Sequence, residues 1–194
     1  MGIADKGGSR SALVTAAVAT IVAEGWQGAG VRSITARAGV PLGALNYHFG
    51  SRDALLRHAA MAEIGRMFQT PAALIAHAPV LVDLVAGMLT WATSPSTSAT
   101  QQILLLEVMA QARRDLALAG DLQAALVAYR DTLAHSLLRL VPPRLDQGSM
   151  AHEADCFAAH CNGLWLQSVI EPAFPADQAT EVAVDLWTRR FSGR

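Results

Sequence analysis

Residues 42–48 carry side chains that suit contacts with a DNA groove. Asn46 can make paired hydrogen bonds to the edge of an adenine, and Leu42 can contact the methyl group of a thymine. Gly43 has no side chain, so the floor of a groove can approach the backbone there. The combination predicts a surface that distinguishes base sequences.

Hydrogen-bond donors flank this segment and suit phosphate oxygens. Tyr47 and His48 belong to its end, while Thr35 and Arg52 lie on either side of it. Phosphate contacts fix the register of a protein on DNA without reading its sequence. We therefore expect these four residues to position the surface. The alternative is that Tyr47 and His48 only pack and cap a helix.

A second group of reactive side chains lies near the C-terminus. His152, Cys156 and His160 recur every four residues, which places them on one face of a helix, and both residue types bind zinc or copper. The three positions extend over about 12 Å of helix, so one ion can join at most two neighbours. We therefore expect no metal and no other cofactor. A redox role for Cys156 is an alternative.

The apolar pattern predicts helices along the whole chain, and Ala and Leu dominate a sequence that is 52% hydrophobic but only 6% aromatic. Gly25 is expected to end the first helix, and Gly39 to turn the chain between short helices at 31–38 and 42–49. Ser51 is expected to cap a helix over 54–68. One further helix is expected to end near Trp91, and the others are expected at 101–114, 120–140, 150–170 and 176–191. The fold class is therefore all-α, with about nine helices.

Length and charge narrow the function. The 194 residues can bury a large core, and no apolar stretch reaches the length that crosses a bilayer. Without an apolar leader, and with its two cysteines five residues apart, the chain is expected to be cytoplasmic. Residues 1–58 hold six basic and three acidic side chains, and the remainder holds nine and thirteen. Only the basic N-terminal part is expected to meet a polyanion.

The segment VRSITARAGVPLGALNYHFGSRDALL, with AAVATIVAEG before it, resembles the N-terminal domain of TetR-family repressors. The glycine turn, the aromatic-His-Phe end and the Ser-basic-acid start of the next helix all fall in register. The resemblance implies a helix-turn-helix DNA-binding domain over residues 1–55 and a ligand-binding and dimerisation domain over 56–194.

Carried over position by position, the family pattern makes Leu42, Gly43 and Asn46 face the groove, and makes Tyr47 and His48 face phosphate. Arg52 matches the usual Lys of the family, and Phe49 matches a core anchor. Gly30 and Pro41 depart from the pattern, because the family often has Ser or Thr caps there. The resemblance therefore places more of the phosphate contact on Thr35 and Arg52.

The segment CNGLWLQSVIEP and the residues after it resemble the C-terminal domain of the choline-responsive repressor subgroup. The resemblance implies a ligand cavity, and a dimer interface made by the last two helices. For the interface we expect Leu166, Val169, Val184 and Trp187. The alternative for the cavity residues is that they are simply core. We expect the cavity to draw on Met88, Trp91, Gln102, Leu105, Met109, Phe157, His160, Asn162 and Trp165.

The sequence as a whole predicts a repressor that binds a palindromic operator as a homodimer and leaves it when a small molecule binds. Its partners would be double-stranded DNA, a second copy and an unidentified effector, without a membrane. No arrangement of nucleophile and base, phosphate-binding glycine loop or paired carboxylates indicates an enzyme. A DNA-binding module without a ligand and a helical protein-interaction domain are the alternatives.

Overall fold

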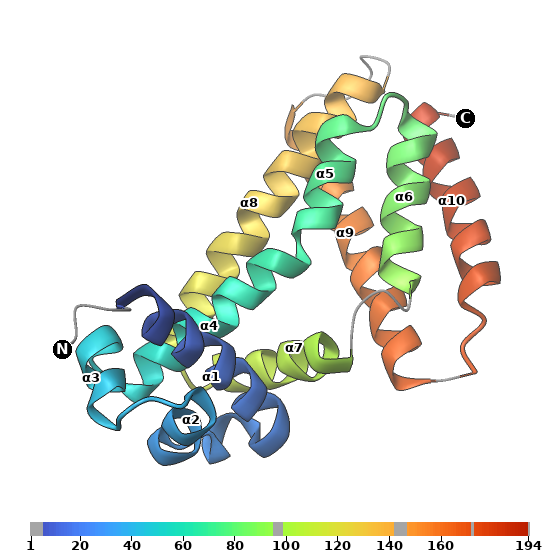
Figure 1. Cartoon of the computed structure of the whole chain (residues 1–194). Helices are drawn as coiled ribbons and strands as arrows, with labels where there is room; N and C mark the ends of the chain where they lie inside the picture. Colours follow the sequence, from blue (N-terminus) through green and yellow to red (C-terminus); the bar gives the residue numbers. More distant parts are fainter. Residues whose placement is uncertain (1–5, 95–98, 142–146, 172, 194) are drawn as a thin grey trace. The chain divides into compact units, whose positions relative to one another are not determined.

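A computed structural model of the protein describes residues 6–94, 99–141, 147–171 and 173–193. Every regular element in these ranges is an α-helix, so the predicted all-α fold class is confirmed (Figure 1). The chain forms two compact units. The first contains the chain up to Met67 and the segment that ends at Leu122, and the second contains the rest. The predicted functional boundary after residue 55 stays a prediction.

The first unit packs its helices around a small apolar core. Leu13, Ile21, Ile34, Leu45 and Leu55 are all fully buried in it, one or more from each of its first four helices. Full burial of such a side chain stabilises the fold by about 1.5–3 kcal/mol. The described helices of this unit are α1 (Lys6–Gly28), α2 (Val31–Ala38), α3 (Gly43–Phe49), α4 (Arg52–Met67), α7 (Ala99–Ala112) and the start of α8 (Leu116–Leu140).

Local signals in the sequence locate the ends of these helices. Gly25 has φ of 73° and breaks α1 near the predicted end, although helical hydrogen bonding resumes as far as Gly28. The Ala54 N–H donates to the Ser51 hydroxyl at 3.1 Å, which confirms the predicted cap of α4. The start of α8 is earlier than predicted, at Leu116, because the Asp115 carboxylate accepts the N–H groups of Ala117 and Leu118.

The second unit consists of the rest of α8 with α5 (Gln69–His77), α6 (Leu81–Thr93), α9 (Gln147–Ile170) and α10 (Ala176–Ser192). The described ranges hold ten helices, and α5 is the one added to the predicted set. A proline such as Pro71 usually interrupts a helical pattern. Pro71 instead lies in the first turn of α5, where the missing N–H of proline costs no intrahelical bond.

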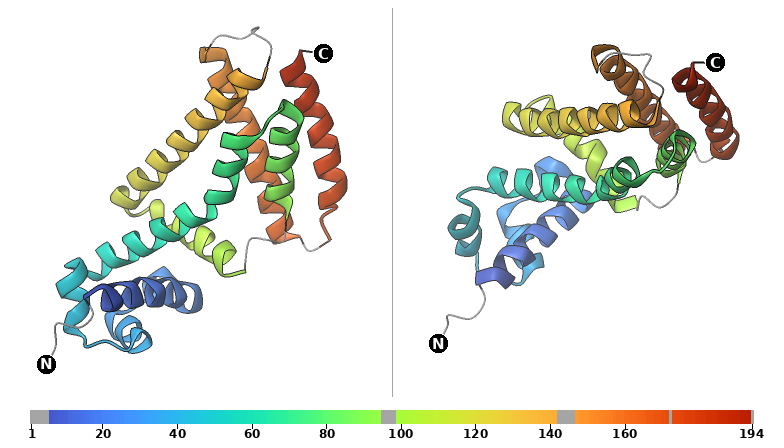
Figure 2. Two further views of the ribbon diagram at one scale, coloured as in Figure 1. Left: turned by 45° about the horizontal axis from the view of Figure 1, so that its top comes forward. Right: turned by 90° about the horizontal axis from the view of Figure 1, so that it is seen from above.

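Three helices of the second unit hold its apolar core. α6 packs against both α9 and α10, and Figure 2 shows the three helices side by side. The ring of Phe157 on α9 lies 5.2 Å from that of Trp187 and 5.8 Å from that of Phe191, both on α10. Leu84, Met88 and Leu89 of α6 are fully buried in this core, and so are Ile75 of α5 and Leu133 and Leu137 of α8. Among the described residues, no helix has the length and apolar character needed to cross a membrane.

Candidate nucleic-acid interface and ligand cavity

The turn between α2 and α3 places the predicted reading surface. Gly39 adopts φ 66° and ψ 30°, a left-handed conformation that confirms the predicted turn. The Val40 N–H then donates to the carbonyl of Thr35 at 3.1 Å, and the Ala44 N–H to that of Pro41 at 2.9 Å. These bonds close α2 and begin α3, which is only seven residues long. Such a short helix depends on its surroundings for stability.

One side chain anchors α3, and its neighbours face outward. Leu45 is fully buried, whereas Leu42 is 55% and Tyr47 69% exposed. Gly43 and Asn46 are exposed as well. Within the described part of the chain no hydrogen bond holds the side-chain amide of Asn46, so its donor and acceptor are available to a ligand. The structure therefore brings the predicted groove-facing residues to one exposed surface, which we call the α3 surface.

The end of α3 is held by a chain of rings. The His48 ring lies 5.0 Å from that of Tyr47, and the half-buried Phe49 ring lies 5.5 Å from that of His58 on α4. The Arg10 guanidinium carbon is 5.1 Å from the centre of the Phe49 ring, and an Arg10 nitrogen is 3.1 Å from Nε2 of His58. Phe49 thus packs against side chains of α1 and α4 and holds the end of α3 against these two helices.

Thr35 does not occupy the position that we expected for a phosphate contact. Its side chain is buried, with 4% exposed, and its hydroxyl donates to the carbonyl of Val31 at 2.9 Å. A hydroxyl that is enclosed and bonded to its own helix offers nothing to a phosphate. Thr35 was placed by position in the motif, and that position says nothing about the direction of its side chain.

Arg52 also differs from the expectation. Its Nε donates to the carbonyl of Ala29 at 2.7 Å, and another nitrogen donates to the carbonyl of Trp26. A third contact joins it to the Asp53 carboxylate at 2.7 Å. The last carbonyls of a helix have no partner within it, and a cation there is favourable. Arg52 therefore links the end of α1 to the start of α4.

Arg32 is a basic residue that the sequence analysis counted but did not select. It is exposed on the first turn of α2, and among the described residues no hydrogen bond or ion pair holds its guanidinium. Arg37 is exposed too, but one of its nitrogens lies 3.8 Å from the carboxylate of Glu24. The excess of basic residues in the N-terminal part pointed to such a cation without identifying it.

Helix α7 belongs to the first unit although it lies far along the chain from α1 to α4. The Trp26 N–H donates to the Glu107 carboxylate at 2.9 Å, beside the break at Gly25, and Gln27 donates to Gln111 at 2.9 Å. These side chains give α1 a second anchor at the point where its regular hydrogen bonding is interrupted. No local pattern predicts this anchor, because the partners lie more than 80 residues apart along the chain.

The predicted cavity residues separate into four groups. Met88 and Phe157 are fully buried in the core of the second unit, and His160 accepts a hydrogen bond from the Trp187 indole at 3.3 Å. Trp91 and Trp165 pack beside that core. Gln102, Leu105 and Met109 lie on α7 in the first unit. Asn162, the remaining predicted residue, lines a cavity.

That cavity lies within the second unit and has a volume of about 320 Å³. Rings form one side of it: the Phe68 ring is 5.2 Å from that of Tyr129. A charged pair forms another, with Nε of Arg130 2.8 Å from the Asp155 carboxylate. We call this the α8–α9 cavity, and its lining residues are Phe68, Leu126, Tyr129, Arg130, Asp155, Ala158, Ala159 and Asn162.

Two acidic groups near this region keep their protons. Burial raises the pKa of the Tyr129 phenol, and a nearby thiol adds to the effect. Burial also raises the pKa of the Cys161 thiol to about 12. Tyr129 therefore presents a neutral hydroxyl, and Cys161 is an inert thiol at neutral pH.

The residues predicted for a dimer interface are not all exposed. Leu166 is exposed, Val169 is half-buried, Val184 packs against the core, and Trp187 is buried within it. The exposed apolar side chains of these helices are instead Leu166 and Ile170 on α9, and Val182 and Leu186 on α10. We call these four residues the α9–α10 face. The interface on these helices stays a prediction, and the structure shows which of their apolar side chains are exposed.

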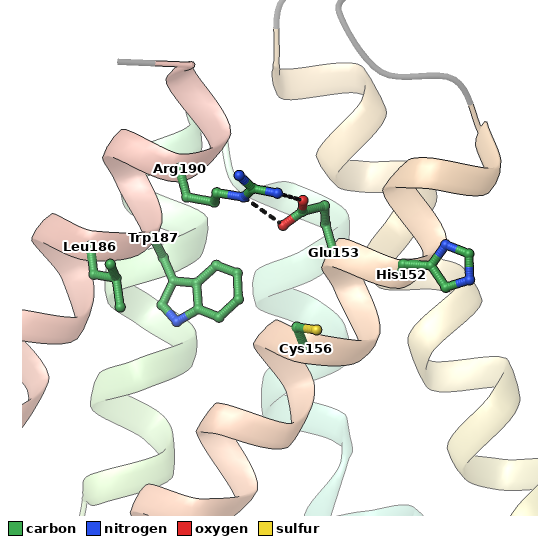
Figure 3. Close-up of a pocket in the computed structure, with 6 residues that line it drawn as sticks. All are labelled: His152, Glu153, Cys156, Leu186, Trp187 and Arg190. Carbon is green, nitrogen blue, oxygen red and sulfur yellow. Dashed lines mark hydrogen bonds and ion pairs between the residues drawn. The ribbon is translucent and has the colours of Figure 1, made fainter.

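His152 and Cys156 line an open groove between α9 and α10 with a volume of about 330 Å³. Figure 3 shows this groove with the Arg190 guanidinium bound to the Glu153 carboxylate across it; Nε of Arg190 is 3.1 Å from that carboxylate. His160, the third member of the histidine and cysteine row, contacts Trp187. In the described ranges no group of three or more His, Cys, Asp or Glu residues could hold a metal ion.

Comparison with known families gives two matches. The bacterial regulatory proteins of the tetR family match residues 13–59, the part that carries the α3 surface. The C-terminal domain of BetI-type transcriptional repressors matches residues 82–191, which is more than half of the chain. The search among proteins of curated function found no match.

Solved structures share the fold over nearly the whole chain. A protein described as a transcriptional regulator of Pseudomonas aeruginosa PAO1 is 26% identical, with a TM-score of 0.72 over 94% of this chain and 93% of that one. A regulator of Saccharomonospora viridis in complex with choline is 15% identical, with a TM-score of 0.76 over 96% and 98%. GusR of Salmonella enterica is 18% identical, with a TM-score of 0.72 over 97% and 98%.

Proposed function

Because this chain belongs to the TetR family of bacterial transcriptional regulators and has a BetI-type C-terminal domain, we propose that it is a ligand-responsive repressor. It binds a palindromic operator as a homodimer and leaves DNA when a small molecule occupies its second unit. Family membership makes it a regulator and not an enzyme. The α3 surface is the single observation that carries the proposal.

The α3 surface supports direct contact with bases. Leu42, Gly43 and Asn46 are exposed together, and Leu45 fixes the helix from behind. In a helix-turn-helix domain the second helix of the motif enters the major groove. An Asn amide that pairs with an adenine edge contributes about 1–3 kcal/mol of discrimination against a wrong base. We assign sequence reading to Asn46 and Leu42.

Phosphate contacts come from a different set than the motif implied. Tyr47 and His48 remain in it, because Tyr47 is largely exposed and His48 lies beside it. Arg32 replaces Thr35 and Arg52, since its guanidinium is exposed whereas their polar groups are bonded within the unit. Each cation that neutralises a phosphate contributes about 0.9 to the slope of log affinity against log salt.

The α9–α10 face supports a homodimer. Leu166 and Ile170 lie one turn apart on α9, and Val182 and Leu186 lie one turn apart on α10, so each pair lies on one side of its helix. Exposed apolar rows of this kind mark interaction surfaces. We assign a second copy of this chain as the occupant, because a two-fold dimer presents two α3 surfaces to a palindrome.

A pair of matched substitutions tests the dimer. Val182→Glu puts a charge into the proposed interface, and Val127→Glu makes the same change at an exposed position of α8. Sedimentation velocity should show monomers for Val182→Glu and dimers for Val127→Glu and the unchanged protein. Dimers of unchanged affinity in Val182→Glu would place the interface elsewhere.

The α8–α9 cavity is the proposed effector site. Its volume of about 320 Å³ is at the lower end of the range typical for small-molecule sites, and rings and polar groups line it together. The Saccharomonospora viridis structure is a complex with choline, so choline is among the first compounds to test. A ligand that couples to DNA binding by about 1–3 kcal/mol would weaken it about 5- to 150-fold.

The proposal is tested by titrating the purified protein onto the DNA upstream of its own gene, and onto a randomised DNA pool, at several salt concentrations. Asn46→Ala and Tyr47→Ala should each weaken selective binding at least about fivefold, which corresponds to the lower end of the roughly 1–3 kcal/mol of a lost contact. Gln123→Ala, an exposed change on α8, is the matched control and should leave affinity unchanged. Failure to select any sequence from the pool would exclude DNA reading and favour a protein-interaction domain.

A further inference from the structure

The α8–α9 cavity holds both signs of charge within one wall. Nε of Arg130 on α8 lies 2.8 Å from the Asp155 carboxylate on α9. Their side chains are 36% and 55% exposed, so a ligand can reach both. A guanidinium carries five N–H donors and a carboxylate about four acceptor positions, so this contact leaves most of their bonding capacity available. The wall is therefore dipolar, with no net charge.

Rings and one amide form the rest of the lining. Phe68 and Tyr129 lie with ring centres 5.2 Å apart and planes tilted by 52°, and Phe68 is also 6.2 Å from the Trp91 ring. Tyr129 stays neutral because burial raises its pKa, so it adds no charge to the cavity that a ligand would have to neutralise. Asn162 supplies an amide that can donate and accept. An apolar, preferably flat, group fits against these rings.

We propose that the effector is a small zwitterion with an aromatic group, whose carboxylate binds Arg130, whose ammonium group binds Asp155, and whose ring packs against Phe68 and Tyr129. The inference rests on the proposed function, because it takes the α8–α9 cavity as the effector site. It specifies the class of ligand, which neither the fold nor the family matches define.

The existing ion pair decides between ligand classes. A ligand with a single positive charge is attracted by Asp155 but repelled by the adjacent Arg130 guanidinium, and a single negative charge meets the reverse situation. A zwitterion can lie along the pair with its carboxylate at Arg130 and its ammonium group at Asp155, so that both of its charges are attracted. Because the two side chains are partly exposed, each of these contacts contributes at most about fivefold in affinity, or about 1 kcal/mol.

The size of the cavity limits the ligand. A volume of about 320 Å³ lies at the lower end of the range typical for small-molecule sites, so the ligand is small. An aromatic amino acid is close to this limit. Three compounds with the same ring and a similar chain isolate the charges: L-phenylalanine carries both, phenylacetate only the negative one, and phenethylammonium only the positive one.

Isothermal titration calorimetry of the full-length protein with these three compounds and choline tests the inference. L-Phenylalanine should bind about fivefold more tightly than each of the others. Asp155→Asn should reduce its advantage over phenylacetate to less than threefold, and Arg130→Gln should do the same for its advantage over phenethylammonium. Circular dichroism and cooperative urea denaturation should show that both variants fold. Tighter binding of choline or phenethylammonium, or no binding of any compound, would overturn the inference.

The same protein samples separate this inference from the proposed function. Operator affinity is measured with and without L-phenylalanine. If L-phenylalanine binds with the expected charge dependence but DNA affinity does not change, the ligand class is supported and the repressor mechanism is wrong. If the protein selects a DNA sequence but does not bind L-phenylalanine, the proposed repressor function stands and the proposed ligand class is wrong.

Discussion

Charged side chains hold helices in both units of this protein, but the helices they hold differ in length. In the first unit Arg52 holds the last carbonyls of α1, Glu107 holds the Trp26 N–H, and Arg37 lies 3.8 Å from the Glu24 carboxylate. In the second unit Arg130 pairs with Asp155 and Arg190 with Glu153, and Arg139 donates to the carbonyl of Ala78 at 3.4 Å. Its interior is filled by aromatic and aliphatic side chains.

Helix length decides how each unit is held together. α2 and α3 have eight and seven residues, too few to be stable alone, so they depend on buried anchors such as Ile34 and Leu45. α9 and α10 have 24 and 17 residues and can bury whole faces. Closely packed faces of this kind respond to the loss of even one methylene group, so the core of the second unit is expected to be the more sensitive to substitution.

The largest predicted effect is on the core of the second unit. Phe157→Ala removes a fully buried ring that contacts both Trp187 and Phe191, and should lower the free energy of unfolding by about 3–5 kcal/mol. Urea denaturation followed by circular dichroism measures it. Phe157→Leu keeps most of the volume and should cost less than half as much. A loss below about 1 kcal/mol for the alanine variant would contradict the importance of this ring cluster.

The next prediction distinguishes the role of Arg52 from that of Arg32, two arginines of the first unit. Arg52→Ala removes charged hydrogen bonds to the end of α1 and should lower the free energy of unfolding by about 2 kcal/mol, while the salt slope of DNA binding stays the same. Arg32→Ala should do the opposite. It should leave stability within about 0.5 kcal/mol and reduce the salt slope by about 0.9.

Arg52→Lys completes that comparison, because it keeps the positive charge and loses the fork of donors. If Arg52 acts through the α1 carbonyls, the lysine variant should lose stability nearly as the alanine variant does. If it acts on phosphate, as the family resemblance implies, lysine should preserve both affinity and salt slope. Full stability of Arg52→Lys would restore the phosphate role.

A smaller effect is expected for the second anchor of α1. Glu107→Ala leaves the Trp26 N–H without its carboxylate acceptor and should cost about 1.5 kcal/mol, or roughly 3–6 °C in the melting temperature of a chain of this size. Glu107→Gln retains an oxygen acceptor and should recover most of the loss. Differential scanning calorimetry compares the two variants. Equal losses would mean that the charge matters more than the hydrogen bond.

Much of the first unit could be predicted because its signals are local. Gly39 and Ser51 occupy the predicted conformation and the predicted cap. The exposed position of Asn46 also follows from its spacing from Leu45. The direction of the Thr35 hydroxyl could not be predicted, because it depends on which face of α2 is covered. The partners of Arg52 are carbonyls some 25 residues away, beyond any local pattern.

The cavity was harder to predict for a related reason. Apolar residues such as Met88 and Phe157 have the same composition and spacing whether they line a ligand site or fill a core. The packing of α6, α9 and α10 makes them core. Asn162 lines a cavity, but whether that cavity binds a ligand stays a prediction. Arg130 and Asp155 were not recognised, since charged residues on long helices are usually solvated.

The smallest predicted effect is the pH dependence of the second unit. Burial raises the pKa of the Cys161 thiol to about 12, so the folded chain keeps this proton at a pH where the unfolded chain releases it. The unfolded state then binds fewer protons, and stability falls as the pH rises from about 9 towards 12. Between pH 8 and pH 10, the unchanged protein should lose about 1 kcal/mol more than Cys161→Ala. Urea denaturation at both pH values measures this difference between slopes, and equal slopes would mean that water reaches the thiol.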